Sequence, residues 1–519
     1  MSLVKSTLTI GFFTFLSRIS GFIRDVLMAN LIGASWLSDA FFVAFKLPNF
    51  FRRLFAEGAF NAAFIPSFSS ILTTEGREAA VKFAGEVMSV LALVLFILNV
   101  IFITFMPWIT PLFAPGFTST PEKFNLTVTL SDITFPYIFF ISLVSLLGGV
   151  LNSMGKFAAP AASPILLNLC MIAAMLGLAH ITPTPAHALS YGVFIAGVAQ
   201  LGWLVLACYR NGMMPPIVTP RMTKQVKTML LLMAPAALGS GVQQLNLLID
   251  VIIASHIPGA VSYLYYADRI TELPIGMIGV AVGTVLLPML SKQIRSGDIA
   301  AARTSMNRAL ELVLLFGLPA SAALCVIAQP IIMVLYQHGA FTVHDMDEAV
   351  PTLIAFTAGL PAFLAVKIFA PGFYANHDTK TPFKIAIACV IVNLFFNLTL
   401  VYVVHLEQVG MALATTIAGW VNVGSMMWIL HKRDIFAPDA LLKSRLTKML
   451  AASGVMAGGL AVAQSIAEPY YSHGAVMKVV SLSGVMTVGV VVFGTSVLVL
   501  KAYDASLVTK LLRRRRSAV

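Results

Sequence analysis

Charged side chains interrupt stretches of this sequence that are otherwise apolar enough for a lipid bilayer. In FKLPNFFRRLFAEGAF, residues 45–60, a lysine, two adjacent arginines and a glutamate separate runs of phenylalanine and leucine. A charge at the centre of a membrane helix costs on the order of 2.5–3.5 kcal/mol, so we expect it to face a cavity or a partner. The candidate functional charges are Arg18, Arg24, Asp25, Asp39, Lys46, Arg52, Arg53, Glu57, Asp250, Asp268, Arg269, Glu272 and Lys367.

The chemistry of the deepest arginines indicates an anionic substrate. Arg18, Arg52 and Arg269 lie well inside their apolar stretches. The planar guanidinium matches the oxygens of a phosphate group, so a cavity lined by these residues would suit a pyrophosphate. For the charges near the first turn the alternative is that they extend to the membrane interface. The residues for which this alternative stays open are Arg24, Asp25 and Asp39.

Spacing along the helices relates several of these charges to one another. Arg53 and Glu57 are four residues apart, so they share a helix face and can pair. Asp268 and Glu272 share a face in the same way.

A second polar set has the chemistry of a sodium site. Asn393 and Asn397 are four residues apart, and Thr415 or Thr416 follows on the next span. Together with the carboxylate of Asp250 they would supply oxygen ligands for a hard cation. The alternative is hydrogen bonding between helices, which uses the same residue types.

Composition places the chain in the membrane. Hydrophobic residues make up 58% of the 519 residues and charged residues 11%, and the mean hydropathy is +0.89. About a quarter of a soluble protein is charged. The apolar blocks are roughly 20–30 residues long, which suits helices that cross a bilayer and not the short strands of a barrel. The net charge of +12 does not indicate nucleic acid, because the basic clusters flank apolar spans.

Apolar blocks between polar breaks predict an all-α polytopic protein with fourteen transmembrane helices. The expected spans are 7–33, 36–72, 79–110, 127–152, 160–180, 187–209, 226–256, 262–290, 302–337, 346–375, 382–404, 408–431, 444–466 and 476–501. The loops between them alternate in charge, and one set holds a single basic residue, Lys123. Under the positive-inside rule this set is periplasmic, and both termini are cytoplasmic. The periplasmic set includes GASWLSD, APGFTSTPEKFN, HIPGAVS and QHGAFTVHDMDE.

The sequence also repeats itself at an interval of about 222–226 residues. Residues 21–48 resemble residues 247–274, which places Pro48 opposite Pro274. Both prolines are expected to kink their helices. Six spans are thus followed by six similar spans in the same orientation, which predicts two lobes in a parallel pseudo-two-fold repeat.

The repeat predicts three parts of the chain. They are a first lobe at 1–215, a second lobe at 216–435 and an appendage of two helices with a basic tail at 436–519. Two similar lobes around a central space are typical of transporters that work by alternating access. Motifs for catalysis are lacking: the sequence has no HExxH, nucleophile elbow or Walker A. We therefore expect no enzyme activity and no catalytic residue.

Four segments carry a resemblance to a known family: SRISGFIRD, DAFFVAFKLPNFFRRLFAEGAF, YYADRITELPIGMIGVAVGT and APGFYANHDTKTP. They resemble the MurJ (MviN) family of bacterial lipid II flippases, in the MOP exporter superfamily with its MATE-like fold. The resemblance implies transport of undecaprenyl-pyrophosphate-linked disaccharide-pentapeptide across the inner membrane for peptidoglycan synthesis. It implies lipid II and membrane lipids as partners, with contacts to cell-wall synthesis or division machinery, and no nucleic acid. It implies no cofactor, with Na⁺ or the membrane potential as the driving force.

The resemblance also carries over a set of residues. The implied substrate-binding positions are Arg18, Arg24, Asp39, Arg52, Arg53, Glu57, Asp268, Arg269 and Glu272. The implied Na⁺ ligands are Asp250, Asn393, Asn397 and Thr416. The last two helices would hold the lipid tail in a groove. The rival interpretations are a MATE-like drug or cation antiporter, another polysaccharide-lipid flippase, and a membrane glycosyl polymerase. The polymerase would need an acid/base or metal cluster in a large periplasmic loop.

Overall fold

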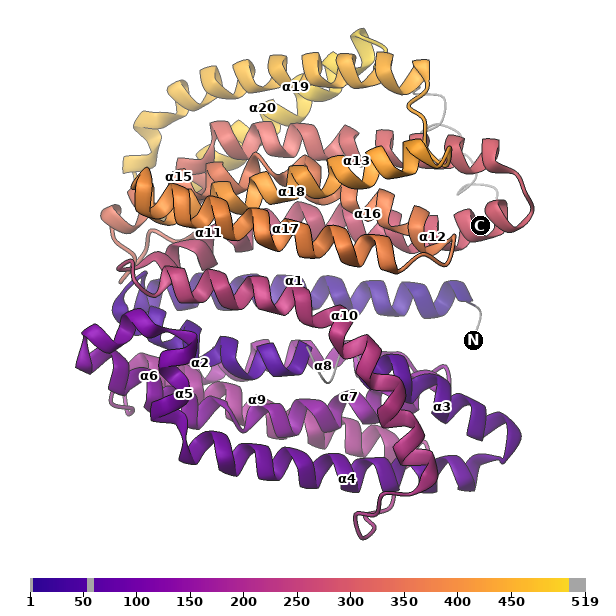
Figure 1. Ribbon diagram of the computed structural model, residues 1–519. Helices are drawn as coiled ribbons and strands as arrows, with labels where there is room; N and C mark the ends of the chain where they lie inside the picture. Colours follow the sequence, from indigo (N-terminus) through magenta and orange to yellow (C-terminus); the bar gives the residue numbers. More distant parts are fainter. Residues whose placement is uncertain (1–2, 54–59, 504–519) are drawn as a thin grey trace. The chain divides into compact units, whose positions relative to one another are not determined.

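A computed structural model describes residues 3–53 and 60–503, and every secondary-structure element in these ranges is helical (Figure 1). The chain packs as two compact units. The first comprises residues 1–262 with 338–342, and the second comprises residues 263–337 with 343–519.

The first unit contains ten α-helices. They are α1 (Leu3–Ile32), α2 (Trp36–Phe51), α3 (Phe60–Thr74), α4 (Arg77–Thr104), α5 (Met106–Phe113), α6 (Pro121–Thr134), α7 (Tyr137–Ser153), α8 (Ala158–Leu178), α9 (Pro185–Arg210) and α10 (Lys224–Ala254), with a short 3₁₀ helix, η2 (Pro115–Ser119). Within this unit α8 packs along both α1 and α9, and α2 packs against α6.

The second unit contains the remaining helices, beginning within α11. They are α11 (Ala260–Pro274), η3 (Ile275–Gly279), α12 (Val280–Arg295), α13 (Ile299–Val326), α14 (Ala328–Leu335), α15 (Val343–Thr357), α16 (Leu360–Tyr374), α17 (Lys380–Leu398), η4 (Thr399–Val403), α18 (Glu407–Lys432), α19 (Ala440–Ala467), η5 (Glu468–Ser472) and α20 (Ala475–Val499). Within this unit α19 packs along α20 and α13.

The helices are consistent with the fourteen expected spans. Ten helices in the described ranges are long and apolar enough to cross a membrane. The four expected spans outside this set correspond to α1, α2–α3, α10 and α11–α12. These are the spans that contain the candidate charges, Lys367 excepted. The charges therefore reduce the lipid-facing character of two equivalent pairs of helices, as expected for helices that meet water or a polar ligand.

The bounds of the helices confirm the internal repeat. α4 begins at Arg77 and α13 at Ile299, 222 residues later, and the same interval separates the starts of α6 and α15. Both repeats also break their third span at one place, after Thr104 and after Val326. A helix pattern that recurs with its breaks goes beyond what similar hydrophobic composition would produce.

Both predicted proline sites interrupt a helix. α2 ends at Phe51, three residues after Pro48, and the turn at Arg52 and Arg53 is π-helical. α11 ends at Pro274, and the π-helical η3 follows directly. Proline lacks a backbone donor and clashes with the preceding turn, so the ladder widens locally. The equivalent spans of the two repeats thus carry their π-turns close to their arginines.

Two attachments position the helices that border the repeats. α10, expected to begin the second lobe, packs in the first unit against α3, α4 and α5. In the second unit the buried Glu311 of α13 accepts hydrogen bonds from Arg308 and from Arg445 of α19, the latter at 2.8 Å. The three-part division at 1–215, 216–435 and 436–519 rests on the repeat and stays a prediction.

Candidate functional site

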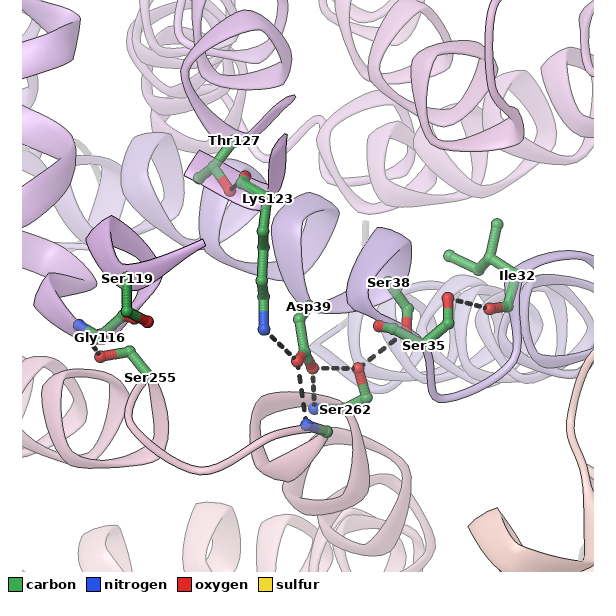
Figure 2. Close-up of polar contacts among 11 residues, drawn as sticks. Ile32, Ser35, Ser38, Asp39, Gly116, Ser119, Lys123, Thr127, Ser255 and Ser262 are labelled. Atoms are coloured by element: carbon green, nitrogen blue, oxygen red, sulfur yellow. Dashed lines mark hydrogen bonds and ion pairs between the residues drawn. The ribbon is translucent and has the colours of Figure 1, made fainter. Parts of the chain in front are cut away.

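Asp39, in the first turn of α2, is the centre of a buried polar network in the first unit. Its side chain is fully buried, and four hydrogen bonds converge on it (Figure 2). One carboxylate oxygen accepts from the Lys123 ammonium at 2.7 Å and from the Gly259 backbone N–H at 3.2 Å. The other accepts from the Ser262 backbone N–H at 3.0 Å and from the Ser262 hydroxyl at 2.6 Å. Donors on both oxygens satisfy the charge that burial would otherwise destabilise.

The network joins the beginnings of three helices. Gly259 and Ser262 lie at the start of α11, where backbone N–H groups have no partner within the helix. Asp39 caps these donors from a different helix, with its negative charge at the positive end of the α11 dipole. Lys123 extends from the first turn of α6, and its ammonium also lies 3.9 Å from the centre of the Phe117 ring. The starts of α2, α6 and α11 are therefore fixed to one another.

Ser38 and Ser262 make a contact between equivalent positions of the two repeats. Their hydroxyl oxygens are 2.8 Å apart, and both residues are fully buried. Ser38 is the third residue of α2, and Ser262 is the third residue of α11. Each serine thus contacts its own counterpart (Figure 2).

Two further contacts are reciprocal. The Gly116 N–H donates to the Ser255 hydroxyl at 3.0 Å, at the end of α10. The Ala340 N–H donates to the Asn30 carbonyl at 2.8 Å, near the end of α1. The third-to-fourth-span loop of each repeat therefore packs on the end of the first helix of the other repeat.

Glycine permits both approaches. A Cβ atom at Gly116 would lie 2.3 Å from the carbonyl oxygen of Ser255, and one at Gly339 would lie 2.1 Å from the side-chain oxygen of Asn30. Gly339 also has a φ of +57°, a conformation that other residues rarely adopt. Any side chain at either position would push the loop off the helix end.

We refer to these contacts together as the inter-repeat contact: Asp39 with Gly259 and Ser262, Ser38 with Ser262, the loop at Gly116 with Ser255, and the loop at Gly339 with Asn30. Its loop residues belong to the four segments whose lack of basic residues predicts a periplasmic location. The arrangement has the chemistry of a reversible closure, because it consists of hydrogen bonds and close packing and of no covalent link.

The second unit has its own version of the contact between α2 and α6. Tyr263 occupies the place of Asp39, and its hydroxyl donates to Asp345 at 3.3 Å. Asp345 lies 222 residues after Lys123, in the first turn of α15. The repeats preserve the position of this contact while only the first places a lysine–carboxylate pair there.

Arg24 and Asp25 are buried within the first unit and do not extend to its surface. The Arg24 guanidinium donates to Asp25 at 2.6 Å and to the Asn168 side-chain oxygen of α8 at 3.0 Å. Their relative exposures are 5% and 3%, which decides against the interfacial alternative for both, and full burial does so for Asp39. In this conformation Arg24 ties α1 to α8, and its role as a substrate contact stays a prediction.

The other arginines of the first unit are more open. Arg18 is half-buried on α1, and its side chain has no hydrogen bond or ion pair within the ranges 3–53 and 60–503. Arg52 donates to the Asn49 side chain at 3.0 Å, and Arg53 is exposed. Glu57 lies outside the described residues, so the predicted Arg53–Glu57 pair stays a prediction.

In the second unit Arg269 is held by its own helix. It pairs with Glu272 at 3.0 Å and lies 4.7 Å from the centre of the Tyr265 ring. Glu272 thus pairs with the arginine three residues before it, and Asp268 is exposed. The structure brings Arg269 and Glu272 together within one unit. A single site formed by these residues with those of the first unit stays a prediction.

The proposed sodium ligands are divided between the units. In the first, Asp250 accepts a hydrogen bond from Asn246 at 3.4 Å. In the second, Asn397 donates to Asn393 at 2.9 Å, and Asn393 donates to Thr415 at 3.3 Å.

Thr416 instead donates to the Ala355 carbonyl of α15 at 2.7 Å, so Thr415 is the hydroxyl that lies with the amides. The amide and hydroxyl oxygens fit a hard cation in chemical type. No cluster of three His, Cys, Asp or Glu side chains occurs among the residues that the structure describes. The Na⁺ site stays a prediction.

Sequence reasoning missed the partners of Asp39. Lys123 attracted notice only as the single basic residue of its loop set, and Ser38, Gly259 and Ser262 attracted none. The available signal was the repeat, which aligns Ser38 with Ser262. Serine is too common for a match at one position to stand out.

The architecture defines a class: a multi-pass helical membrane protein with two six-span repeats and two added helices. Comparison with solved structures supports this. An inward-facing multidrug resistance MATE transporter of the MOP superfamily aligns with a TM-score of 0.66 over 83% of this chain and 95% of its own, at 14% identity. That likeness concerns the fold alone.

Closer similarities define the family. The family model described as "Lipid II flippase MurJ" matches residues 28–482. A "Probable lipid II flippase MurJ" from Rhizobium tropici is 40% identical, covering 100% of this chain and 98% of its own length. A "Lipid II flippase MurJ" from Burkholderia cenocepacia is 37% identical, covering 88% and 89%. A solved "Lipid II flippase MurJ, inward closed conformation" aligns with a TM-score of 0.78 at 28% identity, over 97% of this chain and 100% of its own. The chain belongs to the MurJ family.

Proposed function

We propose that this chain is a lipid II flippase, a transporter and not an enzyme. It moves undecaprenyl-pyrophosphate-linked disaccharide-pentapeptide from the cytoplasmic to the periplasmic leaflet of the bacterial inner membrane. The observation that carries the proposal is the similarity to lipid II flippases along the whole chain, at 40% identity. Both termini are cytoplasmic in this proposal, because the basic loops fall on their side.

The inter-repeat contact supplies the closure that such a cycle requires. With the periplasmic ends held at Asp39, Ser38 and the two glycine loops, the headgroup enters from the cytoplasm. Release to the periplasm requires these contacts to separate. Hydrogen bonds contribute only about 0.5–1.5 kcal/mol each in net terms, so a closure of this kind can open on the timescale of transport.

The headgroup pyrophosphate is bound by Arg18, Arg52 and Arg269. Two observations support this assignment. Arg18 carries a membrane-embedded guanidinium that has no partner among the described residues. Arg52 and Arg269 both lie beside the π-helical turns of equivalent spans, and such turns occur often at functional sites.

Coupling to Na⁺ through Asp250, Asn393 and Asn397 belongs to the same proposal, with the membrane potential as the alternative driving force. Asp250→Asn should then abolish the dependence of transport on Na⁺. Unchanged Na⁺ dependence in this variant would assign Asp250 a structural role.

The deciding experiment is complementation of a depletion strain, with lipid II exposure on the periplasmic face as the readout. Wild type restores exposure, and Arg18→Ala, Arg52→Ala and Arg269→Ala each reach the membrane without restoring it. Arg295→Ala is the control, because this exposed arginine donates only to a carbonyl of its own helix as far as the described residues show. Full exposure after depletion would refute the function. Normal complementation by all three variants would refute the arginine assignment alone.

A further inference from the structure

We propose that Lys367 of α16 is an additional cationic contact for the substrate pyrophosphate, a role that rests on the proposed function. Lys367 lies inside the apolar span Val343–Tyr374, whose mean hydropathy reaches 2.0. Its side chain is exposed in the second unit. Its ammonium has no hydrogen bond or ion pair within the ranges that the structure describes.

The position of the Lys367 stem indicates that it packs on protein. A Cβ atom added to Gly279 would lie 3.2 Å from Cγ of Lys367, and one added to Gly283 would lie 3.6 Å from the Lys367 carbonyl. Gly279 and Gly283 are four residues apart, so they form one small-residue face where η3 passes into α12. The methylene groups of Lys367 therefore lie against the interrupted eighth span.

An ammonium at this depth requires a compensating group. A lysine in the bilayer interior is costly unless it faces water or an anion. Glu272, the nearest acid along the eighth span, already pairs with Arg269. A compact ammonium is a strong point-charge ligand for phosphate oxygens, and such charge-assisted hydrogen bonds are stronger than neutral ones.

Lys367 and Arg269 lie at different depths along one span. Gly279, against which Lys367 packs, follows Arg269 by ten residues, or about 15 Å at 1.5 Å per residue. Lys367 lies on the side of α12 that ends in Lys292 and Arg295. A pyrophosphate entering from that side would meet Lys367 before Arg269, so the second unit offers two successive cationic contacts.

The test uses the full chain in phosphatidylcholine nanodiscs with undecaprenyl pyrophosphate as the probe. Lys367→Met keeps the packed stem and removes the charge, and it should raise Kd about tenfold. Lys367→Arg should stay within about threefold of wild type. Lys292→Met is the matched control and should leave Kd unchanged, because this lysine lies exposed at the end of α12.

The other outcomes overturn the proposal in distinguishable ways. If Lys367→Met binds like wild type while Arg18→Ala binds weakly, the proposed function stands and the role of Lys367 falls. Equal losses for Lys367→Met and Lys292→Met would indicate general surface charge. If Lys367→Met changes only the affinity for phosphatidylglycerol nanodiscs, the phosphate belongs to bilayer lipid. If wild type itself does not bind the probe, the proposed function falls with it.

Discussion

The hydroxyl oxygens of Ser38 and Ser262 lie 2.8 Å apart, although 224 positions separate the two residues. Each is the third residue of an equivalent helix, α2 or α11. Any movement that separates the helix starts must break this contact directly. The pair is therefore a reporter for opening of the inter-repeat contact.

A reversible cross-link at this pair should stop transport. Ser38→Cys with Ser262→Cys, in a chain whose four free cysteines are replaced, should form a disulfide under mild oxidation. Lipid II exposure should fall to the level of the depleted strain and return on reduction. The single cysteine variants control for loss of the hydroxyls. Transport at the wild-type rate by the cross-linked chain would show that the contact need not open.

Alanine at the two close-approach glycines should weaken the contact by different amounts. Gly116→Ala places a Cβ against backbone, an overpacking that costs about 1–3 kcal/mol. Gly339→Ala adds the strain of a positive φ, about 1–2 kcal/mol. Thermal unfolding in detergent should therefore rank Gly339→Ala below Gly116→Ala, and both below wild type.

Gly155→Ala separates these two effects. Gly155 has a φ of +71°, but a Cβ there would have no neighbour within 4 Å. Its Tm should fall through backbone strain alone, by less than the fall at Gly339. Equal losses at all three positions would indicate that the close approaches contribute nothing.

Removal of the Asp39 charge should destabilise the buried network. Asp39→Asn leaves Lys123, with its side chain 10% exposed, without a carboxylate, and breaking a buried pair typically costs about 3–5 kcal/mol. Lys123→Met in the same chain removes the unpaired charge and should recover part of the loss. A double-mutant cycle of unfolding free energies measures this coupling. Additive losses would argue against the pair.

The attachment of the last two helices should depend on Glu311. Its carboxylate is 1% exposed and accepts from arginines on α13 and α19. Glu311→Gln keeps the shape and removes the charge, so both arginines lose their ionic partner at a cost of about 3 kcal/mol. Limited proteolysis between α18 and α19 should become faster. An unchanged cleavage rate would place the attachment in apolar packing.

A pH profile should distinguish the loop between α16 and α17. Burial raises the pKa of Asp378, but hydrogen bonds from Thr381 and the charge of Arg433 outweigh it and lower the pKa to about 2. A carboxyl whose pKa is lower in the folded state stabilises above its unfolded value of 3.8 and loses that contribution as pH falls toward 2.

The comparison for this profile is Asp378→Asn. The Tm difference between wild type and the variant should be constant from pH 8 to about pH 5 and shrink below about pH 4. Arg433→Gln should remove part of the same difference. A difference that changes between pH 5 and 8 would assign it to other groups.

Features that depend on local sequence could be predicted. Hydropathy and loop charge gave the spans, and proline chemistry gave the interruptions after Pro48 and at Pro274, because both act within a few residues. The network of Asp39 could not be predicted, since Lys123 is 84 positions away and Ser262 is 223. Which charges of a helix meet a partner depends on the packing of neighbouring helices. For this reason Arg24 and Arg18, six residues apart on α1, have opposite environments.

The reciprocal loops bear on how such a protein could arise. In a two-fold symmetric homodimer of a six-span chain, the Gly116 and Gly339 contacts would be one contact made twice, and one serine would meet its own copy on the axis. A single ancestral sequence could therefore have encoded the whole closure before gene duplication. Fusion of the copies then freed each position to diverge, so that one half acquired aspartate with lysine and the other tyrosine with aspartate.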